Sequence, residues 1–127
     1  MITELTRMWL TRSTKPFLFK NEYDQELPFS DCDGLGLYVH IPFCRSICSF
    51  CPYCKTLYTE EACSRYIDAL IREIHLAGSQ APGKKTVTSL YFGGGTPALA
   101  ADRIKEIIDA IQEHFIITQG IGIELHP

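Results

Sequence analysis

The chain has 127 residues, 46% of them hydrophobic and 21% charged, which is the composition of a folded globular domain and excludes disorder for most of its length. Its net charge is −3, and no basic cluster offers a surface for nucleic acid. Apolar runs stay short of the about 20 residues that span a bilayer, and charges interrupt the region where a signal peptide would be apolar. We therefore expect no nucleic-acid partner, no membrane partner and a cytoplasmic location.

The N-terminal part of the chain, residues 1–34, shows no sustained helical or strand period and is interrupted by Pro16 and Pro28. This pattern predicts an irregular N-terminal arm. Residues 35–41 form a short apolar run that includes β-branched side chains and stops before Pro42. The run predicts a mostly buried strand.

A helix is predicted after this strand. Thr59 can cap its start, and two glutamates follow in the first turn, where the helix dipole favours negative charge. Apolar residues then recur every three or four positions from Cys63 to Ala77, and we expect Gly78 to end the helix. Cys63 lies on this apolar face and is expected in the core.

The remaining elements repeat the alternation of strand and helix. Residues 87–92 predict a second strand, and residues 121–125 predict a third. Between them a second helix is predicted, whose apolar face carries Ile104, Ile107, Ile108, Ile111 and Phe115. The order βαβαβ predicts an α/β fold with a parallel sheet and right-handed crossovers.

Four of the six cysteines fall within eleven positions, at Cys44, Cys48, Cys51 and Cys54. A disulfide framework would spread its cysteines, so this clustering favours metal or redox chemistry. The C-x3-C-x2-C spacing lets three thiolates converge on one iron–sulfur cluster, and a cluster held at three irons keeps its fourth iron open to a ligand. Because Cys54 supplies a fourth thiolate, a structural zinc site and a ferredoxin-like cluster are the alternatives.

Three glycines at positions 93–95 follow the second predicted strand. They would let the backbone approach a ligand and expose N–H and C=O groups at the carboxyl end of the sheet, where α/β proteins bind ligands. A tight strand-to-helix turn is the alternative. Glu124, at the end of the third strand, is placed to accept hydrogen bonds or to pair with a cationic ligand. We expect His40 to line the core or a pocket, and His75 and His114 to lie on helix surfaces.

The cysteine motif after a first strand, with an aromatic residue before the third cysteine, resembles the radical S-adenosylmethionine (SAM) enzymes. The strings YVHIPFC at 38–44, GGGTP at 93–97 and IELHP at 123–127 resemble the subgroup of oxygen-independent coproporphyrinogen III oxidases. The resemblance implies the first half of a partial (β/α)6 barrel, similar to a TIM barrel. Residues 35–127 would then be an incomplete radical SAM domain, from a truncated chain or from one that needs a partner.

The resemblance also implies the cofactors and their contacts. Cys44, Cys48 and Cys51 would bind a 4Fe-4S cluster, SAM would chelate the open iron, and one electron would cleave SAM to methionine and a 5′-deoxyadenosyl radical. Gly95 and Thr96 would face a possible second SAM. The implied contacts to the first SAM are Tyr38, Phe50, Gly94 and Glu124, with Phe50 beside the adenine. On the residues alone, both aromatic side chains could instead belong to the core.

The implied function is an oxidoreductase that decarboxylates porphyrinogen propionates in haem biosynthesis and takes its electron from a flavodoxin or ferredoxin type of donor. The chain departs from the subgroup at Cys51-Pro-Tyr-Cys54, where the spacing to the next cysteine is one residue longer. This departure leaves the second SAM, the tetrapyrrole substrate and the role of Cys54 open. The alternatives are a non-catalytic iron–sulfur or zinc module, and a radical SAM relative that handles haem.

Overall fold

The computed structural model describes residues 32–125 without a gap, together with eight earlier residues. Those eight are Leu5, Thr6, Met8, Trp9, Arg12, Thr14, Leu27 and Phe29. The irregular arm over residues 1–34 falls largely outside the described residues and stays a prediction.

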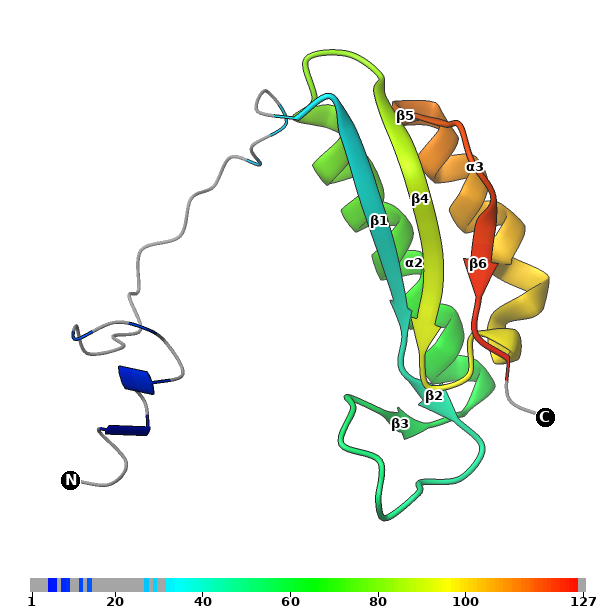
Figure 1. Cartoon of the computed structure of the whole chain (residues 1–127). Helices are drawn as coiled ribbons and strands as arrows, with labels where there is room; N and C mark the ends of the chain where they lie inside the picture. The colour runs from blue at the N-terminus through cyan, green and yellow to red at the C-terminus, as the bar shows by residue number, and fades with distance from the viewer. Residues whose placement is uncertain are drawn as a thin grey trace.

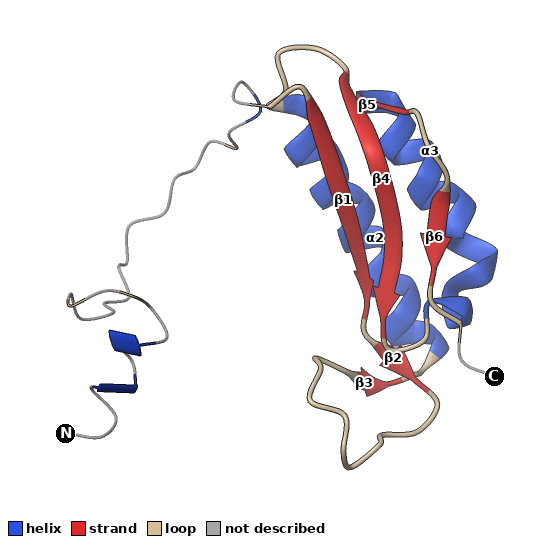
Figure 2. Ribbon diagram, viewed as in Figure 1, coloured by secondary structure: helices blue, strands red, loops and turns tan. Residues whose placement is uncertain are grey.

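The main sheet is parallel throughout and has two helices packed on one of its faces (Figures 1 and 2). Strand β4 (Lys85–Gly94) lies in the middle, with β1 (Gly34–Ile41) on one side and β5 (Phe115–Ile117) and β6 (Ile121–Ile123) on the other. Helix α2 (Glu60–Ser79) links β1 to β4, and η2 (Pro97–Arg103) and α3 (Ile104–His114) link β4 to β5. The α/β fold with order βαβαβ is confirmed.

Strand β1 has one face toward the helices and one face away from them. Val39 and Ile41 are buried on the helix side, whereas Tyr38 is exposed on the uncovered side. This alternation follows from the two-residue period of a strand. Ile41 pairs with Gly94 of β4, so the carboxyl ends of both strands meet at one edge of the sheet.

Helix α2 begins where the sequence predicts and ends later. The side chain of Thr59 caps it by accepting a hydrogen bond of 3.2 Å from the Ala62 N–H. The predicted end at Gly78 is wrong, because the helix includes Gly78 and continues to Ser79. Gly78 is buried under α3, and a Cβ added to it would lie 2.3 Å from Cγ of His114. The glycine is needed for helix packing and does not stop the helix.

The third predicted strand, residues 121–125, corresponds to β6, and the short strand β5 before it was not predicted; both pair with β4. Helix α3 ends at His114, and Phe115 is extended, with φ −130° and ψ 157°. The prediction that Phe115 continues the helix is therefore wrong: pairing with Lys85 and burial of its ring, which is 5% exposed, start β5 there. After a break at residues 118–120, β6 pairs further along β4.

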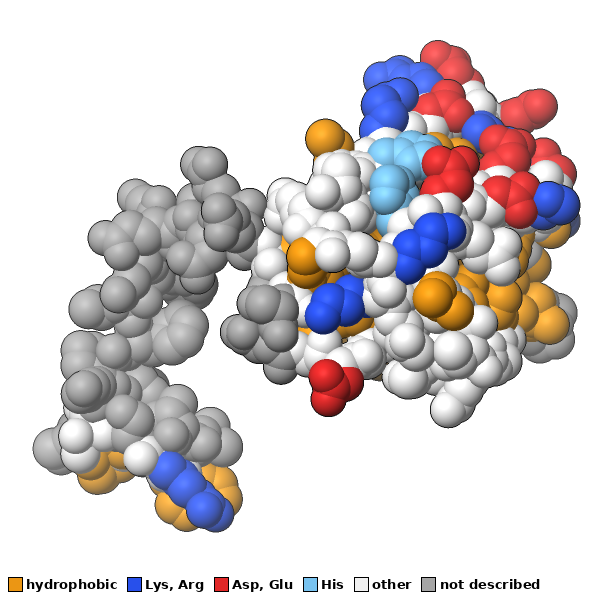
Figure 3. All heavy atoms as spheres, turned by 90° about the horizontal axis from the view of Figure 1, so that it is seen from above, with side chains coloured by type: hydrophobic (Ala, Val, Ile, Leu, Met, Phe, Trp, Pro, Cys, Tyr) orange, Lys and Arg blue, Asp and Glu red, His pale blue; other side chains and the backbone are white. Residues whose placement is uncertain are grey.

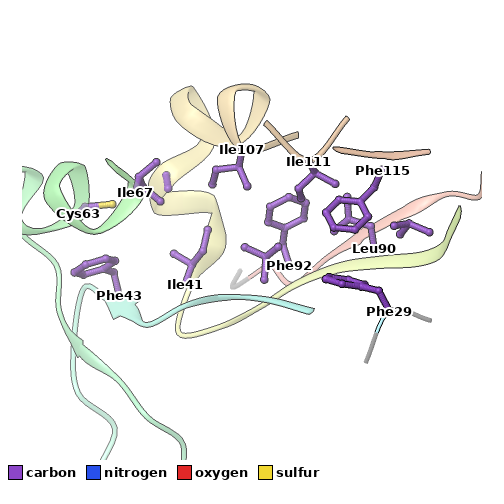
Figure 4. Close-up of a cluster of buried hydrophobic side chains, with 13 residues drawn as sticks. Phe29, Ile41, Phe43, Cys63, Ile67, Leu90, Phe92, Ile107, Ile111 and Phe115 are labelled. Carbon is purple, nitrogen blue, oxygen red and sulfur yellow. The ribbon is translucent and has the colours of Figure 1, made fainter. Parts of the chain in front are cut away.

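The core lies between the sheet and the two helices, where apolar side chains from both layers point toward one another (Figure 4). Cys63 belongs to it with 5% exposure, as predicted. The fully buried larger residues are Phe92, Ile41, Ile67, Leu90, Ile107, Ile111, Val87 and Pro97. Among the described residues, no helix combines the length and the apolar character required to cross a membrane.

Candidate functional site

The cysteine motif lies on a loop that is closed at its base by two short strands. After β1 the chain enters β2 (Phe43–Cys44), passes through the loop and returns as β3 (Thr56–Leu57), which pairs with β2 (Figure 1). The Thr56 N–H donates to the Pro42 carbonyl at 2.8 Å, and the Tyr58 N–H donates to the Cys44 carbonyl at 2.9 Å. These bonds hold the first cysteine at the point where the loop opens.

Within the loop, hydrogen bonds to the backbone shape the segment that carries the later cysteines. The Cys51 N–H donates to the Cys48 carbonyl at 3.3 Å, and the ammonium of Lys55 donates to the Cys51 carbonyl. Nε2 of His40 lies 3.2 Å from the Cys54 carbonyl. All four loop cysteines are free thiols, with Cys44, Cys48 and Cys51 half-buried and Cys54 exposed.

The glycine segment packs directly against the first cysteine. The Gly95 N–H donates to the Ile41 carbonyl at 2.8 Å, which ties the end of β4 to the end of β1. A Cβ added to Gly95 would lie 2.5 Å from the Phe43 carbonyl oxygen and 2.7 Å from Sγ of Cys44. Any side chain at this position would therefore displace the cysteine or the backbone before it.

The expectation that the glycines expose their N–H groups to a ligand is wrong for Gly94 and Gly95. The Gly94 N–H donates to Oε2 of Glu124 at 3.1 Å, and the Gly95 N–H donates to the Ile41 carbonyl. The reason is that β4 continues through Gly94, so both groups meet neighbouring protein acceptors. Gly94 has a φ of +122°, a conformation that favours glycine.

A carboxylate and two tyrosines gather on the uncovered face of the sheet at the same edge. Glu124 directly follows β6, and its Oε1 accepts a hydrogen bond of 3.4 Å from the hydroxyl of Tyr91. The ring of Tyr38 stacks on that of Tyr91, with centroids 6.2 Å apart. Desolvation raises the pKa of Tyr38, and the negative charge of Glu124 raises it further, so the hydroxyl stays neutral.

The other two predicted SAM contacts are placed differently. Phe50 lies in the cysteine loop with its side chain 85% exposed. Thr96 precedes η2, where its carbonyl accepts a hydrogen bond from the Leu99 N–H at 2.9 Å while its side chain makes no capping bond. The structure thus joins Tyr38, Gly94 and Glu124 through Tyr91 and joins Gly95 to Cys44, but it brings neither Phe50 nor Thr96 into these contacts.

Sequence reasoning missed Tyr91 and underrated His40. Tyr91 is three residues before the end of β4, as Tyr38 is three residues before the end of β1, and the two are direct register partners. Aligning the two strand ends would have revealed this pair. His40, expected to line the core or a pocket, contacts both the Cys54 carbonyl and the Tyr38 hydroxyl, the latter at 3.4 Å.

The donor set fits an iron–sulfur cluster. Three half-buried thiols on one tethered loop provide the ligand type that such clusters use.

No protein-family model matches the chain. Over 79 residues it is 44% identical to the anaerobilin synthase of Escherichia coli O157:H7, covering 61% of this chain and 18% of that protein. Over 99 residues it is 34% identical to an oxygen-independent coproporphyrinogen III oxidase of Pseudomonas aeruginosa, covering 73% and 22%. It is also 38% identical over 93 residues to a haem chaperone of Lactococcus lactis, covering 71% and 23%.

The fold is similar to that of the coproporphyrinogen III oxidase from Escherichia coli, a solved structure described as a radical SAM enzyme. The TM-score is 0.67 at 34% identity, with 73% of this chain and 22% of that chain covered. The chain therefore spans about a fifth of the length of the relatives it matches. Over that shared part, the chain belongs to the radical SAM family that includes the oxygen-independent coproporphyrinogen III oxidases.

Proposed function

We propose that this chain binds a 4Fe-4S cluster and SAM at the carboxyl end of its sheet and takes part in radical chemistry of the oxidoreductase kind. The observation that carries the proposal is the packing of Gly95 against Sγ of Cys44. It places the glycine segment, expected to contact SAM, beside the first expected cluster ligand. Two motifs that lie fifty residues apart in the sequence thus form one site.

In this proposal Cys44, Cys48 and Cys51 hold three irons, and the cluster, when bound, supplies the electron that cleaves SAM reductively. Cys54 is not a ligand. Its carbonyl is held near His40 while its side chain is exposed, and the tethered carbonyl keeps this residue at the base of the loop. A cluster with one open iron needs only three thiolate ligands, so in this proposal the Cys54 thiol stays uncoordinated.

The remaining residues would bind and orient SAM. Glu124 carries a carboxylate that Gly94 and Tyr91 hold in place, and a fixed negative charge suits the amino group of SAM. Tyr38 extends the same patch with a neutral hydroxyl. The exposed ring of Phe50 offers a face on which the adenine can stack. Thr96, together with Gly95, remains the proposed contact of a second SAM.

For the reaction itself, oxidative decarboxylation of a porphyrinogen is the leading candidate, because oxygen-independent coproporphyrinogen III oxidases are among the relatives. A porphyrinogen substrate, a flavodoxin or ferredoxin type of electron donor and a cytoplasmic location belong to this proposal. Haem handling is the second candidate, favoured by the matched haem chaperone. Haem titration followed by absorbance, and product analysis after incubation with coproporphyrinogen, distinguish the two.

Cluster ligation is tested by anaerobic reconstitution with iron and sulfide. The Cys48→Ala variant should lose the cluster and the Cys54→Ala variant should keep it, as measured by iron and sulfide counts. Electron paramagnetic resonance of the reduced protein should change when SAM is added. Loss of the cluster in Cys54→Ala would indicate ligation by four cysteines, and a signal that SAM does not alter would refute the open iron.

The contact between Gly95 and Cys44 makes a separate prediction. Gly95→Ala should lower the iron and sulfide content after reconstitution, because the new methyl group would press on the thiol of Cys44. Gly36→Ala is the matched control, since a Cβ at Gly36 meets nothing within 4 Å. If both variants take up as much iron and sulfide as the unaltered chain, Gly95 does not support the cluster site.

A further inference from the structure

Two histidines and a glutamate meet at the opposite end of the sheet from the cysteine loop. His75 lies near the end of α2, and Glu113 and His114 end α3. Nδ1 of His75 lies 3.0 Å from Nε2 of His114 and 3.7 Å from Oε2 of Glu113. Figure 3 shows histidine side chains together on this surface, next to acidic ones. The histidines, expected on helix surfaces, are half-buried and in contact with each other.

We propose that His75, Glu113 and His114 form a binding site for a divalent transition-metal ion such as Zn²⁺. Two imidazoles and a carboxylate are ligands that these ions accept. One ligand atom from each of the three residues can be chosen so that all lie within 4.8 Å of one another. Two ligands of a tetrahedral zinc ion are about 3.3 Å apart, which is close to the 3.0 Å and 3.7 Å that separate Nδ1 of His75 from His114 and Glu113.

Packing between the helices holds the two rings near this arrangement. A Cβ at Gly78 would lie 2.3 Å from Cγ of His114, so the missing side chain provides the space that the ring occupies. The rings of His75 and His114 meet edge to face with centroids 5.3 Å apart, and the ring of Phe115 lies 6.4 Å from that of His114. A site already formed in this way loses little side-chain entropy when the ion binds.

The electrostatic surroundings favour a cation. Helices α2 and α3 both end here, and the carbonyl groups of a last turn carry partial negative charge. The last turn of α2 contains no basic residue, and Glu113 adds a full negative charge. Lys84 is a positive charge at this end, but its ammonium donates to the Gln112 carbonyl at 2.9 Å.

Metal binding would replace the hydrogen bond between the histidines. In a neutral pair, one of the two facing nitrogens carries the shared proton. Coordination through both nitrogens moves that proton to the other nitrogen of its own ring, so no proton is released. Water can complete the coordination, because the side chains of His75 and Glu113 are 41% and 65% exposed.

The site is independent of the proposed cofactor chemistry. Strand β4 has ten residues and separates the two ends of the sheet by roughly 30 Å. A chain that fails to load the iron–sulfur cluster would therefore leave the zinc-site proposal intact. A chain that fails to bind zinc at the histidines would likewise leave the cluster proposal intact.

The test is a titration of the full chain, labelled with ¹⁵N-histidine, with zinc chloride. Nuclear magnetic resonance of the ring nitrogens should show the signals of His75 and His114 changing together and reaching saturation. Zinc taken up by the cysteine loop would not move these signals, so the measurement separates the two sites. The ring of His40, which contacts the loop, reports on zinc bound there.

Two variants and a control complete the test. In His75→Gln the His114 signal should stop responding, and in Glu113→Gln the dissociation constant should rise at least about tenfold. Glu61→Gln, an exposed change at the other end of α2, should bind like the unaltered chain. Circular dichroism checks that each variant is folded. If His75→Gln does not fold, the change in zinc affinity of Glu113→Gln, at an exposed position, tests the site instead. Signals that stay unchanged at millimolar zinc, or an unaltered response of His114 in His75→Gln, would overturn the proposal.

Discussion

Replacing Gly78 with alanine should destabilise the chain, although the same change in an open helix is stabilising. Alanine is favoured over glycine in a helix interior by up to about 1 kcal/mol. Gly78 has no positive φ in the structure, so backbone strain does not oppose the substitution. Any loss of stability must then come from the contact between α2 and α3.

The size of the loss follows from the atoms that the new methyl group would meet. It would lie 2.3 Å from Cγ and 2.5 Å from Cβ of His114, whereas ordinary contacts begin at 3.4 Å. Rotation of the His114 side chain about its Cα–Cβ bond moves Cγ but leaves Cβ in place. The helices must therefore separate by nearly 1 Å. Overpacking of this kind costs about 1–3 kcal/mol, and the helix gain offsets up to about 1 kcal/mol of it, so we expect a net loss of up to about 2 kcal/mol.

Urea unfolding followed by circular dichroism measures this loss, and a double-mutant cycle assigns it. In a His114→Gly background, which removes both contacting atoms, Gly78→Ala should be neutral or stabilising. The free energy of unfolding of the four proteins then gives the coupling between the two positions. A Gly78→Ala variant that is more stable than the unaltered chain would refute the packing explanation for this glycine.

Two further predictions concern charges. Arg103→Met should lower the urea midpoint more at about pH 6 than at about pH 3, because Arg103 lowers the pKa of Glu106 and this contribution is lost as the pH falls through that lowered pKa. Lys105→Met, whose ion pair stays within α3, should show a smaller difference. Glu124→Gln should lower the pKa of Tyr38, measured by ¹³C resonance of labelled tyrosine; an unchanged pKa would mean that the charge of Glu124 does not contribute to raising it.

Local patterns predicted the elements whose stability is local. The apolar run before Pro42 and the cap at Thr59 place β1 and the start of α2 correctly, because strand burial and capping depend on residues close in the sequence. The end of α2 was missed because Gly78 contacts a residue thirty-six positions later. Phe115 was missed for a similar reason, since pairing with Lys85 decides that it leaves the helix.

At the candidate site, motif spacing predicted the residue types but not their contacts. The cysteine spacing singles out a loop, and the glycine run singles out the end of β4. Neither motif shows that Gly95 packs on Cys44, or that the Gly94 N–H donates a hydrogen bond to Glu124. Those contacts depend on the register between strands, which only the folded sheet defines. Tyr91 was missed because its pairing with Tyr38 depends on that register.

The direction of the chain accounts for the separation of the two candidate sites. In this parallel sheet each helix runs back against the strands, so helices α2 and α3 both end where the strands begin. Partial negative charge collects at that end, beside His75 and His114, and suits a metal cation. The loops that follow β1 and β4 meet at the other end, where Cys44, Gly95 and the anchored carboxylate of Glu124 are held by strand pairing. In the two proposals, a ligand with a cationic amino group would pair with Glu124 at the carboxyl end of the strands, and a divalent ion would bind the imidazoles of His75 and His114 at the opposite end.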